Sequence, residues 1–159
     1  MNAEEASAVS DLSIEGFVVR TDLAYDIERH MWVAERDDGN VRVGMDTLGV
    51  ETAGTLAQLD FVETGTMLAR GEAFGTLEAE KFVGPLVTPI SGVVVTVNTG
   101  ATEDPGVVER EPYDGGWMVE ISPSDPDTDS AELVSGIDSI TDQFRTRIAE
   151  YRRDGVLAE

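Results

Sequence analysis

Among its 159 residues the chain has one lysine, Lys81, while the ten other basic residues are all arginines. An arginine guanidinium carries a charge but forms no ordinary acyl amide, whereas a lysine amine can form one. A lysine kept where arginine would serve as a simple cation indicates covalent use of its amine. The competing interpretation is that an acidic, lysine-poor composition left one lysine by chance.

The residues around Lys81 predict a hairpin with the lysine near its tip. The segment Leu77-Glu78-Ala79-Glu80-Lys81-Phe82-Val83 has strand-like residues at both ends and a polar middle. An amine displayed in this way could hold a long acyl group as a swinging arm, which would visit several active sites at high effective concentration. This pattern favours a carrier over an enzyme.

Side chains suited to ordinary catalysis are few. The single histidine, His30, lies beside Trp32 in a predicted strand, where a structural role is more common than that of a general base. Residues 71–75 lack the lysine of a phosphate-binding loop and precede a strand, so we interpret them as a turn. The absence of cysteine excludes disulfides and cysteine-based sites, and one histidine excludes a histidine cluster. We expect no catalytic site and no metal site.

The chain is strongly acidic, with a formal net charge of -21. Such an excess is typical of halophilic proteins, because salt screens the repulsion between carboxylates; the alternative is a moderately acidic protein of an ordinary cell. Nucleic acid and anionic membranes are excluded as partners, since both need clustered lysine and arginine. No apolar run reaches the length of a membrane span, and residues 1–15 lack the basic start of a signal peptide. We therefore expect a cytoplasmic protein.

Short strands with glycine-rich turns must position Lys81. Asp-Gly-Asn within residues 36–40 predicts a hairpin turn, and Asp46-Thr47 is predicted to cap a short helix that runs through Val50. Strands are predicted at residues 17–19, 30–34, 41–45, 55–61, 67–69, 73–77, 82–87, 92–97 and 117–121. So many short strands predict a mainly β fold, an antiparallel sandwich or flattened barrel.

The two ends of the chain differ in character from its middle. Residues 1–15 are small, polar and acidic, which predicts a flexible leader. Residues 16–125 are expected to form the domain, and residues 126–159 a C-terminal helical extension packed on it. In this extension, apolar residues recur every three or four positions, at Ile137, Ile140, Phe144, Ile148 and Tyr151. The stripe is predicted to pack on the sheet; the alternative is a helix that docks a partner.

Several short motifs occur in a characteristic order between about Leu23 and Asp125. They are Tyr…His-x-Trp, Val-x-Val-Gly, Phe-Gly-x-x-Glu-x-x-Lys, Pro-x-Ser-Gly, Pro-Tyr…Gly-Trp and Pro-Ser-Asp, which lie within residues 25–33, 41–44, 74–81, 89–92, 111–117 and 122–125. In this order the chain resembles the glycine cleavage H-protein family, whose members carry lipoate on a lysine. A biotin carrier would have methionine on both sides of the lysine, where this chain has Glu80 and Phe82.

The resemblance implies a flattened fold of the lipoyl and biotinyl (barrel-sandwich hybrid) type with short helices. It implies that Lys81 carries lipoate in an amide bond and that Glu78 is recognised by lipoate ligase or another lipoate-attaching enzyme. The dithiolane of the lipoyl arm would exchange sulfur bonds and store two electrons for partner enzymes. The chain itself would be a non-catalytic carrier subunit.

After the lysine, the chain departs from the Ala-x-Ser-Asp-Leu-Tyr pattern of ordinary family members. It has Phe82-Val83-Gly84-Pro85, which we expect to dock partners, and a longer final helix. Both features resemble the H-like lipoate-binding proteins of the sulfur-oxidising heterodisulfide-reductase-like system, so that complex is the favoured partner. The alternative is glycine cleavage, with the P, T and L proteins as partners and an aminomethyl group as cargo. A platform that passes lipoate to other proteins and a non-lipoylated acidic interaction module stay open.

Overall fold

The computed structural model describes residues 11–157, which form three antiparallel sheets and five helices. The strands are β1 (Asp11–Ile14), β2 (Phe17–Arg20), β3 (Ala24–Asp26), β4 (Met31–Glu35), β5 (Val41–Met45), β6 (Leu56–Phe61), β7 (Met67–Leu68), β8 (Ala73–Ala79), β9 (Val83–Val87), β10 (Gly92–Val97) and β11 (Val119–Pro123). The helices are α2 (Thr47–Ala53), α3 (Thr99–Glu103), α4 (Gly106–Arg110), α5 (Pro126–Ser130) and α6 (Ile137–Arg153).

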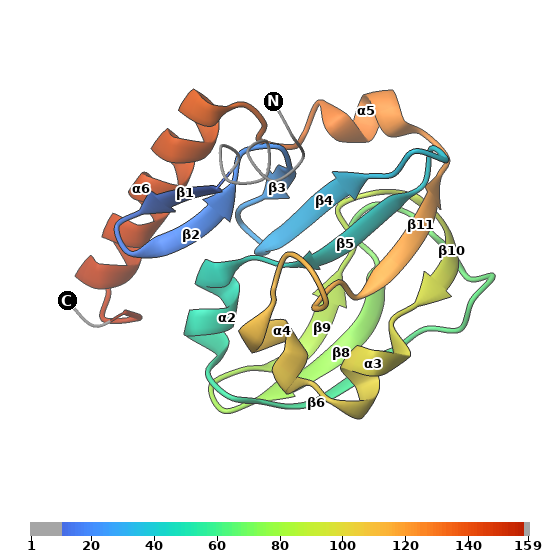
Figure 1. The fold of residues 1–159 in the computed structure, drawn as a ribbon, viewed down its shortest axis with the longest axis horizontal. Coiled ribbons are helices and arrows are strands. Elements are labelled where there is room, and N and C mark those ends of the chain that lie inside the picture. The colour runs from blue at the N-terminus through green and yellow to red at the C-terminus, as the bar shows by residue number, and fades with distance from the viewer. Residues whose placement is uncertain (1–10, 158–159) are drawn as a thin grey trace, which may run out of the picture.

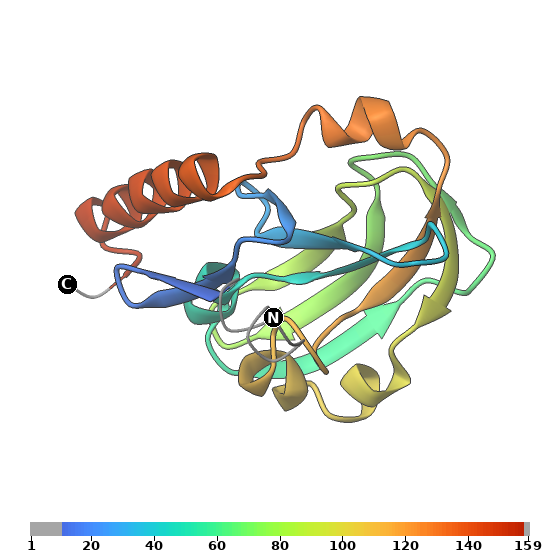
Figure 2. The same ribbon diagram turned by 45° about the horizontal axis from the view of Figure 1, so that its top comes forward.

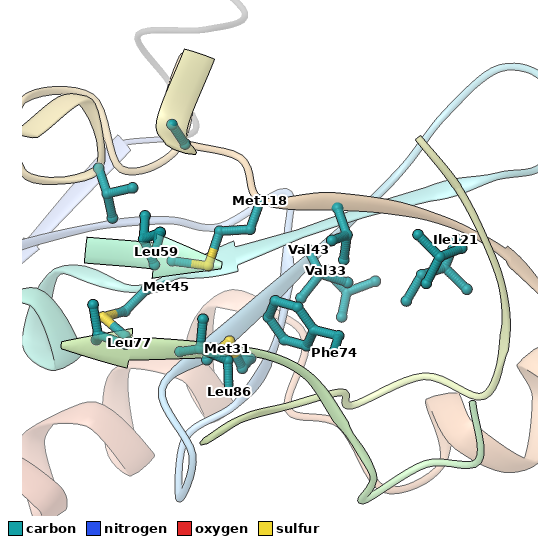
Figure 3. Close-up of a cluster of buried hydrophobic side chains, with 14 of the residues drawn as sticks. Met31, Val33, Val43, Met45, Leu59, Phe74, Leu77, Leu86, Met118 and Ile121 are labelled. Carbon is teal, nitrogen blue, oxygen red and sulfur yellow. The ribbon is translucent and has the colours of Figure 1, made fainter. Parts of the chain in front are cut away.

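Two of the sheets enclose the main hydrophobic core (Figure 1). One has six strands in the order β3-β4-β5-β11-β10-β7, and the other has three in the order β6-β8-β9. Figure 3 shows side chains from both sheets, among them Val43, Leu59, Phe74 and Ile121, packed together between them. The prediction of a mainly β fold with a C-terminal helix is confirmed, in the form of a flattened sandwich whose sheets do not close into one barrel.

Strand β5 shows how the sequence pattern produces this arrangement. Val41, Val43 and Met45 are buried in the main core, because successive side chains of a strand point to opposite faces. Gly44 faces the other side, where the Trp32 ring of β4 lies so close that a Cβ on Gly44 would overlap it. The Val-x-Val-Gly motif therefore combines core positions with one close approach.

A second, smaller core lies at one end of the molecule, between α6 and the β1–β2 hairpin (Figure 2). Ile140, Phe144 and Ile148 are fully buried in it. The Phe144 ring meets Tyr25 of β3 edge-on, with 5.1 Å between the ring centroids. The apolar stripe is thus a packed face, although Ile137 at its beginning is exposed.

The prediction of a flexible leader over residues 1–15 is wrong for its last part. Residues 11–14 form β1, which pairs with β2 from Asp11↔Arg20 to Ile14↔Phe17, and Ile14 is buried. A lone two-stranded ribbon is marginal in water and needs a partner to pack against. That partner is α6, more than a hundred residues away in sequence, so the local pattern did not reveal the strand. Residues 1–10 lie outside the described residues.

Other differences concern the bounds of elements. His30 is not in a strand: it precedes β4 with a φ of 62°, in the left-handed region that histidine enters more often than most residues. Strand β11 begins at Val119, two residues later than predicted. The short helices α3 and α4 between β10 and β11 were not predicted. No helix among the described residues is long and apolar enough to cross a membrane.

Candidate functional site

Lys81 lies at the tip of the β8–β9 hairpin, as its sequence context predicts. The last pair of the ladder between these strands is Glu78↔Val83, and residues 79–82, here named the lysine loop, connect them. The Ala79 N–H donates to the Phe82 carbonyl at 2.7 Å and closes the loop. Strand β9 begins at Val83, one residue later than predicted, because Phe82 belongs to this loop.

The end of α2 holds the main chain of the lysine loop in place. The Lys81 N–H donates to the Ala53 carbonyl at 2.8 Å, and the Glu80 N–H donates to the Thr55 carbonyl at 2.9 Å. Between these acceptors lies Gly54, with a φ of 79°. A Cβ on Gly54 would lie 2.6 Å from the Glu80 carboxylate, so glycine is needed both for the backbone conformation and for the close approach.

The side chain of Lys81 is exposed. Within residues 11–157, no ion pair or hydrogen bond involves its amine. The combination of a fixed main chain and an unengaged amine suits a group that another enzyme must reach and acylate.

The other predicted site residues surround the loop. Glu78 is exposed at the end of β8, opposite Gln58 of β6 and Val83 of β9, and no hydrogen bond or ion pair among the described residues joins it to Lys81. Phe82 and Val83 are exposed apolar residues directly after the lysine. Gly84 leaves room for the Phe82 ring, which would lie 3.2 Å from a Cβ at that position. The structure therefore brings the predicted docking segment and the lysine to one surface.

A cavity of about 560 Å³ opens beside Lys81. We name it the Lys81 cavity. Most of its lining is apolar, and it includes Met31, Met45 and Leu86 of the main core, which Figure 3 labels. The lining residues are Glu28, Arg29, His30, Met31, Met45, Gly49, Thr52, Ala53, Lys81, Phe82, Pro85, Leu86, Val87, Tyr151 and Val156.

One side of the Lys81 cavity is polar. His30 Nε2 lies 2.8 Å from the Tyr151 hydroxyl, and His30 Nδ1 lies 3.4 Å from an Asp46 carboxylate oxygen. Asp46 is fully buried and accepts the Gly49 N–H at 2.8 Å, which caps the N-terminus of α2. Burial raises the pKa of Tyr151, so its hydroxyl stays protonated and can donate.

Sequence reasoning identified the cap but not this grouping. Asp46 was predicted to begin a helix, and the structure confirms it. The position of Tyr151 beside His30 was missed, because 121 residues separate them and only the packing of α6 brings them together. Within the described residues, no three histidine, aspartate or glutamate side chains form a group that could hold a metal ion.

Comparison with known proteins agrees with this geometry. The family model of the glycine cleavage H-protein matches residues 23–142. The chain belongs to the glycine cleavage H-protein family. Members of this family are non-catalytic carriers that hold lipoate on a lysine, which confirms the expected family, cofactor and carrier class.

Individual relatives are similar over most of the chain. Glycine cleavage system H protein 3 of Aquifex aeolicus is 31% identical over 154 residues, which cover 95% of both chains. The glycine cleavage system H protein of Mycobacterium avium is 36% identical over 121 residues, covering 76% of this chain and 88% of its own. The crystal structure of a glycine cleavage system H protein from Mycobacterium marinum superimposes with a TM-score of 0.62 at 35% identity, covering 67% of this chain and 87% of that one.

Proposed function

We propose that this chain is the H protein of a glycine cleavage system and that lipoate is attached to Lys81. The observation that carries the proposal is the position of the single lysine, at the tip of a hairpin in the H-protein fold, with its main chain held by α2 and its amine exposed. When bound, lipoate supplies a dithiol/disulfide couple that carries an aminomethyl group and electrons between the P, T and L proteins.

The residues around Lys81 fit such a group. The exposed amine gives a lipoate-attaching enzyme access, and the lysine loop keeps the attachment point in one place. The apolar lining of the Lys81 cavity offers the aliphatic part of the arm a surface away from water, to which the exposed residues Phe82 and Pro85 contribute.

Glu78 is proposed to be a recognition residue for the attaching enzyme. It precedes the lysine by three residues, as in the family motif, and it is exposed at the end of β8. No described hydrogen bond or ion pair gives it a role in the fold. A carboxylate in this position can accept charge-assisted hydrogen bonds from an enzyme that approaches the loop.

The segment Phe82-Val83-Gly84-Pro85 is proposed to select the client enzymes. Its apolar residues are exposed beside the lysine, where a partner that reads the arm must dock. This segment is also the observation that favours the second candidate, a carrier for the sulfur-oxidising heterodisulfide-reductase-like system. Glycine cleavage is the better-supported client, because the relatives reported above are H proteins of that system.

One assay separates the two clients. The protein is lipoylated in vitro and supplied, with the arm in its oxidised, disulfide form, to a glycine cleavage P protein with glycine and labelled bicarbonate; decarboxylation of glycine breaks the S–S bond, so the reduced arm serves as the inactive control. We expect glycine–bicarbonate exchange at a rate comparable to that of an authentic H protein, and none with Lys81→Arg. Full lipoylation without exchange would assign the carrier to other enzymes, and the heterodisulfide-reductase-like complex would be assayed next.

Intact mass measured on protein from the native host tests the attachment itself. A mass increase of one lipoyl group on Lys81 is expected. An unmodified chain from cells that lipoylate their other carriers would instead support the acidic interaction module.

We further propose that the protein is adapted to salt, and the observation that supports this is its net charge of -21. Salt shortens the range of repulsion between carboxylates, so the folded state should gain stability as ionic strength rises. Thermal unfolding in dilute buffer and in molar potassium chloride measures this effect. A melting temperature that does not change with salt would remove the basis for salt adaptation.

A further inference from the structure

We propose that the open edge of β1 and the first turns of α6 form a groove that binds a basic, extended segment of a partner protein as an added β-strand. The groove, here named the β1 groove, has a volume of about 550 Å³ and shares no lining residue with the Lys81 cavity. Strand β1 precedes residue 23, where the match to the family model begins. The lining residues are Leu12, Ser13, Ile14, Ile137, Asp138, Thr141, Asp142 and Arg145.

Side chains cover the outer edge of β2, the other strand of this two-stranded sheet. The Tyr25 hydroxyl accepts from the Arg20 N–H at 2.8 Å and donates to the Arg20 carbonyl at 2.7 Å. The Tyr113 hydroxyl donates to the Val18 carbonyl at 3.0 Å. Because these main-chain groups already have partners, the side on which the sheet can accept another strand is that of β1.

The register of the hairpin determines which backbone groups of β1 point outward. Arg20 and Val18 direct these groups away from β1, so the residues opposite them, Asp11 and Ser13, direct theirs away from β2. Within residues 11–157, no hydrogen bond involves the outward N–H and carbonyl of Ser13. An open strand edge of this kind can bind an extended segment through main-chain hydrogen bonds.

Helix α6 supplies the second wall of the β1 groove. Its lining residues form one stripe from Ile137 to Arg145, which extends about 12 Å along the helix, close to the length of about 13 Å expected for four residues of a strand. Ile137 is 56% exposed although it begins the apolar stripe of the helix. An apolar side chain is therefore available to contact a residue bound beside Leu12.

An ion pair fixes the two walls relative to each other. Figure 2 shows α6 lying along the β1–β2 hairpin, and Ile14 belongs to the core that joins them. The Arg152 guanidinium donates to the carbonyl of Glu15, in the hairpin turn, at 3.2 Å and lies 3.7 Å from the Glu15 carboxylate. A groove whose walls are held in this way costs little ordering when a ligand binds.

The charges of the β1 groove favour a basic occupant. Of the lining residues only Arg145 is basic, whereas Asp138 and Asp142 are exposed carboxylates that form no ion pair within the described part of the chain. A second copy of this chain would bring another net charge of -21, and residues 1–10 contain two glutamates and no basic residue. A partner segment with lysine or arginine is complementary where these two are not.

The geometry also sets a pattern for the partner segment. Alternate residues of an added strand face α6, because successive side chains of a strand point to opposite sides. The segment that fits has an apolar residue for the surface of Leu12 and Ile137, with a basic residue two positions away on each side for Asp138 and Asp142. The acetylated and amidated peptide Lys-Thr-Val-Thr-Lys has this pattern and serves as the probe.

The experiment adds this peptide to the isotope-labelled full chain at about 0.15 M salt, where electrostatic attraction is screened beyond about 8 Å. We expect NMR shift changes confined to residues 11–14 and 137–145, and slower hydrogen exchange of the Ser13 amide in the complex. The same peptide with N-methyl groups on both threonines keeps its charge but loses the main-chain donors that face β1. It should bind about tenfold more weakly or less tightly still.

Two variants of the chain test the two walls. Ser13→Pro removes the outward N–H, a change that an edge strand tolerates, and should weaken binding about fivefold. The double variant Asp138→Asn, Asp142→Asn should also weaken it about fivefold. The matched control is Glu103→Gln, Glu109→Gln, which removes two exposed carboxylates from α3 and α4 and should leave binding unchanged.

Each result decides the question. Localised shifts, weaker binding by the N-methylated peptide and an effect of the aspartate pair alone would support the added strand. Equal effects of both charge variants, with shifts spread over the acidic surface, would overturn it.

Two further outcomes would assign the β1 groove to another occupant and so overturn the proposal. Sedimentation that shows a wild-type dimer, absent in Ser13→Pro, would assign it to a second copy. A Ser13 amide already protected from exchange in the free monomer would assign it to residues 1–10 of the same chain. If Ser13→Pro is unfolded, the aspartate pair and the N-methylated peptide decide. None of these results depends on lipoylation of Lys81, which the assays above test separately.

Discussion

In two hairpins of this molecule the last residue pair before the loop is a glutamate opposite a valine, but the valine is buried in one hairpin and exposed in the other. In β4–β5 the last pair is Glu35↔Val41, and in β8–β9 it is Glu78↔Val83. Val41 is 6% exposed and belongs to the main core, whereas Val83 is 76% exposed. The hairpin that presents Lys81 thus leaves in solvent an apolar residue of a type that the other hairpin buries.

The two loops also differ in how their backbone groups are satisfied. Residues 36–40, here named the acidic loop, form backbone hydrogen bonds to one another, from Arg36 to Asn40 and from Gly39 to Arg36, with Gly39 in the left-handed region. The lysine loop instead donates two backbone N–H groups to the carbonyls of Ala53 and Thr55. An ordinary turn needs no neighbour, whereas the turn that presents the amine is fixed by one. The lysine loop therefore differs from the acidic loop in two ways that suit a functional site: a neighbouring segment fixes its main chain, and an apolar residue beside it is exposed.

Moving the lysine between the loops gives the largest expected effect. The double variant Lys81→Arg, Arg36→Lys keeps the net charge and places the single lysine on the acidic loop. We expect lipoate ligase to leave it unlabelled, while Arg36→Lys alone is labelled only at Lys81, as peptide mass spectrometry would show. Labelling of the double variant at position 36 would mean that any exposed hairpin lysine suffices.

The two valines should separate stability from recognition. Val41→Ala removes buried methyl groups and should lower the free energy of unfolding by about 2 kcal/mol. Val83→Ala changes an exposed position and should alter it by less than about 0.5 kcal/mol. Urea unfolding measures both. In the exchange assay with the P protein, only Val83→Ala is expected to slow turnover at equal lipoylation, and equal turnover in both variants would contradict a docking role.

Sequence alone predicted the parts of this comparison that are local. The polar tip between strand-like residues 77 and 83 located the lysine loop, and Asp-Gly-Asn located the acidic loop. Both signals work because a turn is determined by a few adjacent residues. The Asp46 cap was predicted for the same reason.

The parts that were missed depend on contacts between distant residues. The hydrogen bonds from the lysine loop to Ala53 and Thr55 join main-chain groups, so no side-chain pattern marks them. The difference between Val41 and Val83 is invisible in sequence, since each follows a polar tip in a predicted strand. The contact of Tyr151 with His30 needs α6 and the β1–β2 hairpin in place, and β1, the first strand of that hairpin, was not predicted.

The support from α2 can be tested through two glycines. Gly39 and Gly54 both have positive φ values, of 87° and 79°. An alanine at position 39 would meet nothing within 4 Å, so Gly39→Ala should cost only the backbone strain, about 1 kcal/mol. An alanine at position 54 would also collide with Glu80, so Gly54→Ala should cost more, about 2 kcal/mol or above.

The same pair should differ in modification. Gly54→Ala displaces the lysine loop and should slow lipoylation several-fold in folded protein, whereas Gly39→Ala should be labelled at the wild-type rate. Rates are compared at a temperature where melting curves show both variants folded. If Gly54→Ala is destabilised but labelled normally, the hydrogen bonds from α2 stabilise the fold without positioning the lysine.

The two glutamates before the loops give the smallest expected effect. Glu35 and Glu78 are both exposed, and each is paired with a valine at the last position of its ladder. Glu78→Gln and Glu35→Gln therefore remove one charge each from a chain of net charge -21, and neither should change the free energy of unfolding by more than about 0.5 kcal/mol. Losing a charge-assisted hydrogen bond to the attaching enzyme costs about 1.5 kcal/mol or more, which predicts lipoylation about tenfold slower in Glu78→Gln alone. Because the overall change in charge is the same, any difference in rate reports local recognition beside Lys81. Equal rates in the two variants would mean that the enzyme reads the loop and its lysine without this carboxylate.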